Sequence, residues 1–175
     1  MVIDLGTTVA GIRLGSCVYN ASGPRTGSAA ALSKIASSEA GAVLTKSATL
    51  VAQQGNPQPR IWHSPNKAAS MNSEGLPNSG IDYYVQDETI EEAMAPAKGK
   101  TKPYMVSISG KTLEDNLKML DRIQERIGAG APISCVELNL ACPNVIGKVS
   151  SLSLFARPEG LVEMRGRSRE LLTRL

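Results

Sequence analysis

Apolar and polar residues alternate from Ile133 to Leu140, which is typical of a β-strand. Successive side chains of a strand point to opposite faces, so the alternation separates the residues into two sets. One face carries Val136, Leu138 and Leu140, and the opposite face carries Cys135, Glu137 and Asn139. A carboxylate and a carboxamide are costly to bury without partners. The second face is therefore predicted to turn toward a bound polar ligand.

The segment after this strand places a cysteine at the strand's carboxyl end. Pro143 cannot donate to a neighbouring strand and residues 144–147 read as a turn, so the strand is predicted to end near Leu140. Cys142 then lies on a loop just past the strand. In a barrel of parallel strands, catalysis takes place at that end. Cys142 is a candidate catalytic residue, although a free cysteine is more often a small buried apolar residue.

Strand and helix patterns alternate along the rest of the chain. Ser28 is predicted to cap a helix that continues to about Ala40. The strongest helix follows Thr112, which resembles a capping box with Asp115. The predicted elements, in order, are a hairpin, a first strand near 17–20, the helix at 28–40, a strand at 42–45, a short helix at 88–97, a strand at 104–109, a helix to Gly128 and the strand at 133–140. This alternation predicts an α/β fold of parallel βα units, with strands ending near Asn20, Lys46, Ser109 and Leu140.

Residues 50–80 show no strong periodicity and are rich in Pro, Asn, Gln, Ser and Gly. A connection of this length without secondary structure is uncommon unless it is a functional loop. The single histidine, His63, and the single tryptophan, Trp62, lie in it. A histidine with no metal-spaced partner is more often a surface residue than a ligand. We assign His63 no role and predict no metal site.

Length and composition narrow the possible folds and functions. The 175 residues suffice for one globular domain but are fewer than the roughly 250 of a complete (β/α)8 barrel. The net charge of +3 is not clustered as nucleic-acid binding requires. The sequence shows neither a run of about 18 apolar residues nor a leader pattern, so we expect no membrane span and no targeting segment. Three cysteines without metal-ligand spacing favour a reducing compartment.

Four stretches, in order along the chain, resemble one enzyme family. They are Asn20-Ala21-Ser22-Gly23, Leu44-Thr45-Lys46-Ser47-Ala48-Thr49, Asn72-Ser73-Glu74-Gly75-Leu76-Pro77-Asn78, and Glu137-Leu138-Asn139-Leu140-Ala141-Cys142-Pro143-Asn144-Val145-Ile146-Gly147-Lys148. Together they resemble the class 1 dihydroorotate dehydrogenases, cytosolic flavoenzymes of pyrimidine synthesis, and most of all the fumarate-using class 1A. The resemblance covers residues 20–148 and is not recognised after Lys148.

This resemblance implies the amino-terminal half of a (β/α)8 TIM-type barrel, truncated, with an amino-terminal hairpin. It implies oxidation of dihydroorotate to orotate with FMN as the cofactor and fumarate as the electron acceptor. It also implies a cytoplasmic homodimer, with neither nucleic acid nor a membrane as a partner. Residues 1–148 would form the half-barrel with the flavin-ring and substrate motifs. Residues 149–175, which contain arginine but no lysine, would form a divergent tail.

The resemblance also assigns roles to individual residues. Cys142 would be the catalytic base. The flavin would be bound by Ala21, Ser22, Lys46, Ser47 and Asn139. The substrate would be bound by Lys46, Asn72, Ser73, Glu74, Gly75, Leu76, Asn139 and Asn144. Ordinary structural alternatives stay open for three of these positions: a simple turn at 21–24, a solvated Lys46 and a hydrogen-bonded core amide at Asn139.

Two departures from the family bear on activity. Glu74 stands where the family motif has Met, and a carboxylate there would repel the substrate's own carboxylate unless the side chain turns away. The flavin phosphate site of such barrels is built by loops after strands seven and eight, which a half-barrel lacks. The competing hypothesis is a non-catalytic, truncated half-barrel that binds a ligand or partner weakly. We expect the 175-residue chain alone to bind FMN poorly.

Overall fold

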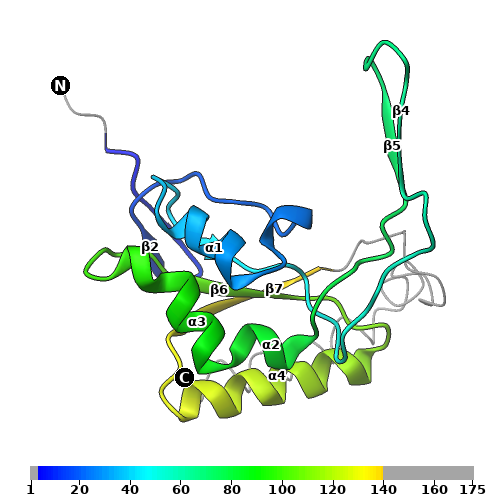
Figure 1. Cartoon of the computed structure of the whole chain (residues 1–175). Coiled ribbons are helices and arrows are strands. Elements are labelled where there is room, and N and C mark those ends of the chain that lie inside the picture. Colours follow the sequence, from blue (N-terminus) through cyan, green and yellow to red (C-terminus); the bar gives the residue numbers. More distant parts are fainter. Residues whose placement is uncertain (1–3, 140–175) are drawn as a thin grey trace.

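The computed structural model of the protein describes residues 4–139 and has a parallel sheet at its centre (Figure 1). Within this range the sheet has three strands, β3 (Val43–Leu44), β6 (Tyr104–Ile108) and β7 (Ile133–Leu138). Their order is β3-β6-β7, and both neighbouring pairs are parallel. Helices connect consecutive strands of the sheet, so the predicted βα units are present.

Three of the four α-helices in the described residues begin close to the predicted positions. The four helices are α1 (Ala29–Ala36), α2 (Ile81–Val85), α3 (Asp87–Met94) and α4 (Leu113–Gly128), with 3-10 turns η1 (Pro24–Thr26) and η2 (Ala95–Ala97). Helix α2 was not predicted. Thr112 Oγ1 accepts from Asp115 N at 3.1 Å, and the Asp115 carboxylate accepts from Thr112 N at 3.2 Å. The predicted capping box is therefore confirmed.

Helix α1 begins as predicted but is shorter than predicted. Ser28 Oγ accepts from Ala31 N at 3.3 Å, which confirms this N-cap. The helix ends at Ala36 and not near Ala40, and the Ser37 and Ser38 hydroxyls donate to carbonyls of its last turn. Serine hydroxyls compete in this way for helix carbonyls and favour helix ends.

Two antiparallel hairpins lie outside the parallel sheet in the described part of the chain. β1 (Thr7–Val9) pairs with β2 (Ile12–Leu14), as predicted for the beginning of the chain. β4 (Ile61–His63) pairs with β5 (Ser70–Asn72), and this hairpin projects from the body of the molecule (Figure 1). The sequence did not predict the second hairpin, because strands of 3 residues are too short to show an alternation.

The first barrel strand, predicted near residues 17–20, is not a strand in the structure. Asn20 makes the contact with β3 through its side chain: Oδ1 accepts from Leu44 N at 2.9 Å, and Nδ2 donates to Leu44 O at 2.7 Å. Gly41 N donates to Val18 O at 2.8 Å at the other end of the segment. The strand prediction is wrong here, because a carboxamide supplies the bonds that a strand backbone would have made.

The two faces of the parallel sheet pack against different elements. The residues Val43, Tyr104, Val106, Ile108 and Ile133 form one apolar cluster with the helices. On the opposite face, Leu44 and Met105 pack against Leu14 of β2. Val136 and Leu138 join the helix-covered cluster and Cys135 joins the other one, which agrees with the predicted alternation in β7.

Several predictions fall outside the described residues. They concern the positions of Cys142 and Asn144 and the tail at 149–175. The last strand, predicted to end near Leu140, ends at Leu138. Within residues 4–139, no helix combines the length and the apolar character needed to cross a membrane.

Candidate ligand site

The sheet face opposite the helices changes from apolar to polar along the strands. Met105 of β6 and Cys135 of β7 belong to the apolar part. Ser107 and Glu137 follow two residues later on the same strands, and Asn139 comes after β7 on the same alternation. Burial, with a smaller contribution from Glu137, raises the pKa of the Cys135 thiol. A polar layer thus lies at the carboxyl ends of β6 and β7, and the neutral thiol of Cys135 lies two residues earlier on β7.

Hydroxyl groups connect this polar layer into one hydrogen-bonded chain. Ser107 Oγ donates to Glu137 Oε1 at 2.7 Å. Ser47 Oγ lies 3.0 Å from Ser107 Oγ and 2.6 Å from Ser22 Oγ. Asn139 Nδ2 also donates to Ser47 Oγ, at 2.9 Å. The chain links four segments that are far apart in the sequence.

The Glu137 carboxylate fixes the direction of these bonds. A serine hydroxyl has one proton to donate. Ser107 uses its proton on Glu137, so Ser47 donates to Ser107 and Ser22 donates to Ser47. The oxygen of Ser22, which lines the cleft described below, is therefore left to act as an acceptor toward a ligand.

A cleft of about 380 Å³ lies between these strand ends and hairpin β4–β5. Most of the predicted site residues line it: Ser22, Lys46, Asn72, Glu74, Gly75, Leu76 and Asn139. The hairpin contributes Ile61, His63, Ser70 and Met71. Residues from all four sequence motifs are thereby brought to one place.

The other predicted residues that the structure describes, Ala21, Ser47 and Ser73, do not line the cleft. Ser47 is buried behind the cleft wall and bonds to Ser22 and Asn139. Ser73 instead accepts from the Asn56 side chain through both its carbonyl and its hydroxyl, at 3.0 and 2.9 Å.

Lys46 brings a positive charge to the cleft. Its residue is only 6% exposed, so the alternative of an ordinary solvated lysine is wrong. Its backbone N donates to Thr26 O at 3.0 Å, which holds the end of β3 against the η1 turn. A charged group is withdrawn from water at a cost unless polar groups surround it. The surroundings of Lys46 therefore suit a polar or anionic ligand.

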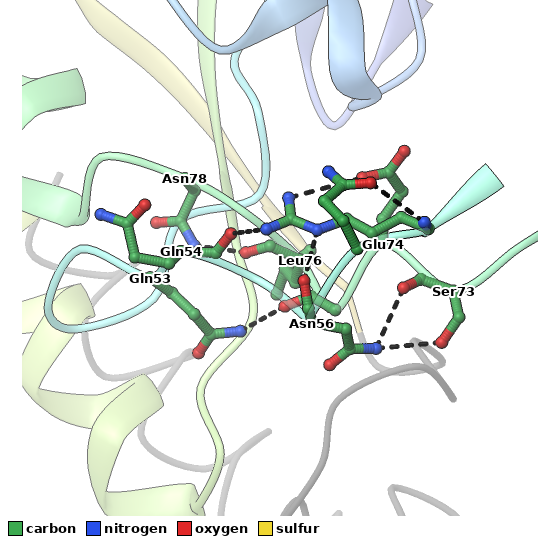
Figure 2. Close-up of polar contacts among 10 residues, drawn as sticks. Gln53, Gln54, Asn56, Ser73, Glu74, Leu76 and Asn78 are labelled. Carbon is green, nitrogen blue, oxygen red and sulfur yellow. Dashed lines mark hydrogen bonds and ion pairs between the residues drawn. The ribbon is translucent and has the colours of Figure 1, made fainter.

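Sequence reasoning missed the segment that supports the substrate motif. Gln53 Nε2 donates to Gly75 O at 2.5 Å, and Asn56 N donates to Glu74 O at 3.0 Å (Figure 2). Gly75 has a φ of +71°, and a Cβ there would lie 2.3 Å from Asn56 Oδ1, so only glycine fits. The sequence held no signal for these contacts beyond a stretch rich in carboxamides.

The side chains around the cleft suit an organic ring rather than a metal ion. Within residues 4–139, no group of three or more His, Cys, Asp and Glu side chains could hold a metal. The polar groups at the cleft are hydroxyls, carboxamides, an ammonium group, the imidazole of His63 and the carboxylate of Glu74. Carboxamides and hydroxyls both donate and accept, as a heterocycle with N–H and C=O groups requires.

Comparison with protein families identifies relatives of the chain. Residues 4–162 match the family model described as dihydroorotate dehydrogenase. The chain is 44% identical over 131 residues to the dihydroorotate dehydrogenase (fumarate) of Lachancea kluyveri, covering 74% of the chain and 38% of the relative. It is 41% identical over 131 residues to the enzyme of the same name from Kluyveromyces lactis, covering 75% and 39%. The chain thus spans about two fifths of the length of these curated relatives.

Solved structures show the same fold. The chain resembles DHODH from Eimeria tenella in complex with ferulenol, with a TM-score of 0.72 and 19% identity over 98% of this chain and 44% of that one. The ligand-free structure from the same organism gives a TM-score of 0.71 and 20% identity, over 98% and 46%. These similarities confirm the predicted partial barrel.

The family match extends past Lys148 to residue 162, and the division into 1–148 and 149–175 stays a prediction. The match covers most of the chain, and the curated relatives named above carry the name of the same family. The four motifs quoted from the sequence resemble that family as well. The chain therefore belongs to the dihydroorotate dehydrogenase family.

Proposed function

We propose that the protein oxidises dihydroorotate to orotate, with FMN as its cofactor and fumarate as its electron acceptor. The observation that carries this proposal is the convergence of Lys46, Asn72 and Asn139 on one cleft. In barrels of parallel strands, the loops at the carboxyl ends form the active site. The names of the curated relatives supply the reaction and the acceptor, since both read dihydroorotate dehydrogenase (fumarate).

The groups at the cleft fit the rings of both proposed ligands. Asn72 and Asn139 can each donate and accept, which suits a pyrimidine edge that carries N–H and C=O groups. Ser22 offers an acceptor and Lys46 a positive charge. Dihydroorotate dehydrogenases are flavin-dependent, and a flavin ring has a similar edge. We assign the flavin ring of FMN to Ala21, Ser22, Lys46, Ser47 and Asn139, and the pyrimidine to the 72–76 motif.

The reaction removes a proton from one ring carbon of dihydroorotate and a hydride from the neighbouring carbon. Acceptance of that hydride is the chemistry that the flavin supplies when it is bound. Cys142 takes the proton as a thiolate. Lys46 stabilises the negative charge that develops on the substrate carbonyl. Asn72, Asn139 and Asn144 hold the ring so that the two carbons meet the base and the cofactor.

We place the protein in the cytoplasm as a homodimer that passes electrons directly to fumarate. The support is its resemblance to the fumarate-using class and the word fumarate in the names of its relatives. Sedimentation velocity together with a fumarate-coupled assay tests this assignment. A requirement for NAD and a second subunit would contradict it.

Binding of orotate and FMN to the purified chain tests the proposed function. We expect orotate binding by calorimetry, lost in Lys46→Ala because the buried charge is removed, and retained in Lys34→Ala, whose lysine is exposed on α1. We expect FMN to bind weakly in the 175-residue chain. Where dihydroorotate bleaches bound flavin, Cys142→Ala should abolish bleaching and leave the flavin bound. A chain that binds neither ligand would refute the proposal.

The second candidate function is a non-catalytic half-barrel that binds a ligand or partner weakly. It is favoured by the span of the chain, about two fifths of its curated relatives, and by the three-stranded parallel sheet of the described residues. A barrel closes only with its full set of strands, and unpaired edges promote association. Concentration-dependent association without turnover would support this candidate, and stoichiometric flavin bleached by dihydroorotate would exclude it.

A further inference from the structure

The substrate motif at 72–78, which lines the cleft, is joined to the preceding residues 53–60. Gln53 and Asn78 exchange two backbone hydrogen bonds, each 2.9 Å long. Their side chains extend the contact, because Gln53 Nε2 donates to the carbonyl of Gly75 at 2.5 Å (Figure 2). The substrate motif is therefore held by the preceding segment and not only by its own turn.

Arg60 connects both segments through one guanidinium group. Its Nη2 donates to Gln54 O at 2.7 Å, and its Nε donates to Asn56 O. Its Nη1 lies 3.9 Å from Glu74 Oε2. The backbone carbonyl of Arg60 accepts from Ser73 N at 2.8 Å. A guanidinium presents several donors in a fixed plane, which suits such a junction.

The ion pair of Arg60 with Glu74 controls a charge at the cleft. Glu74 lines the cleft, and the side chains of Arg60 and Glu74 are only 19% and 23% exposed. Charges that are partly withdrawn from water interact more strongly than fully solvated ones. A carboxylate without a partner at position 74 would therefore repel an anionic ligand. The Glu74 side chain instead turns to Arg60, which offsets its charge.

We infer that Arg60 and Glu74 form a positioning pair that sets the charge preference of the cleft. The pair anchors the 72–78 motif and neutralises the carboxylate of Glu74, so that the cleft accepts a ring that carries a carboxylate. The inference rests on the proposed function for the identity of that ring.

Binding of a charged and a neutral ring tests the inference on the full chain. Orotate carries a carboxylate, and uracil is the same ring without it. Calorimetry with both ligands is performed on four variants: Arg60→Met, Arg60→Lys, Glu74→Met and the double variant Arg60→Met/Glu74→Met. Arg122→Met is the matched control, because Arg122 also pairs with a carboxylate, that of Asp82, which unlike Glu74 does not line the cleft.

The expected result is a selective loss of orotate binding. Arg60→Met weakens orotate by about tenfold, equivalent to about 1.4 kcal/mol, and uracil by less than about twofold. The double variant regains most of the orotate affinity, because the repelling carboxylate is gone. Arg60→Lys keeps the positive charge but loses the planar set of guanidinium donors. Its orotate affinity therefore falls between those of Arg60→Met and the unmodified chain. Arg122→Met binds both ligands as the unmodified chain does.

Two results would overturn the inference. Equal weakening of orotate and uracil, without recovery in the double variant, would mean that Arg60 only supports the loop. A urea-unfolding cycle of Arg60→Met and Glu74→Met, measured without ligand, would disprove the pair if it gave no coupling between the two sites. Absence of orotate and uracil binding in the unmodified chain would refute the proposed function instead, and the unfolding cycle would still decide whether the pair exists.

Discussion

Replacing Asn20 with alanine should destabilise the protein by about 2–4 kcal/mol. The carboxamide of Asn20 bonds to both backbone groups of Leu44, at 2.9 and 2.7 Å. Leu44 is 1% exposed, so water has poor access to the backbone groups left behind. Each of the two buried backbone groups left without a partner costs about 1–3 kcal/mol, so the two together cost about 2–6 kcal/mol. Partial relaxation of the segment around residue 20 keeps the sum in the lower part of that range.

Equilibrium urea unfolding, followed by far-UV circular dichroism, measures this loss. In thermal unfolding the same loss corresponds to about 5–15 °C for a chain of this size. Asn20→Asp should be at least as damaging as Asn20→Ala, because it places a carboxylate oxygen against the carbonyl of Leu44. Asn66→Ala is the control, since Asn66 bonds only within the exposed turn of hairpin β4–β5.

The reasoning would be refuted if Asn20→Ala unfolded within about 0.5 kcal/mol of the unmodified protein, the range of ordinary surface substitutions. That result would mean that water or a shifted backbone forms hydrogen bonds with the backbone N–H and C=O of Leu44 in place of Asn20. The segment before β3 would then not depend on a side chain for its contact with the sheet.

Three further predictions concern stability. Thr112→Ala removes the capping box of α4 and should cost about 1 kcal/mol in urea unfolding, and an unchanged midpoint would contradict this. Ser107→Ala should lower the free energy of unfolding by about 1–3 kcal/mol, because Glu137 and Ser47 lose a buried hydrogen-bond partner. A urea midpoint equal to that of the unmodified protein would contradict the hydrogen-bonded chain of hydroxyl groups. Burial raises the pKa of Tyr104. Above about pH 10 the native state therefore keeps a proton that the unfolded chain releases, so the free energy of unfolding falls as the pH rises. Tyr104→Phe should make this fall less steep in unfolding measured against pH. Equal slopes of stability against pH in the two proteins would disprove the prediction.

The sequence by itself determined the elements whose signals are local. The capping box at Thr112 and the N-cap at Ser28 lie within one helical turn, so a few neighbouring residues decide them. The alternation in β7 was readable for a similar reason, since each side chain's face follows from its neighbours. The motifs around Lys46 and Asn72 were readable as family signatures, although their meeting at one cleft was inferred and not visible in the sequence.

The tertiary structure decided the contacts made between distant segments. Whether residues 17–20 form a strand depended on Asn20 finding Leu44, and no local pattern encodes that choice. Arg60 resembles any polar loop residue until the fold places Glu74 beside it. Hydrogen bonds and ion pairs act over a few ångströms, so they exist only after the chain has brought their partners together. The local signals therefore predicted the helices α1, α3 and α4, the strands of the parallel sheet and the family. The fold alone decided the ion pair of Arg60 with Glu74 and the direction of the hydroxyl chain.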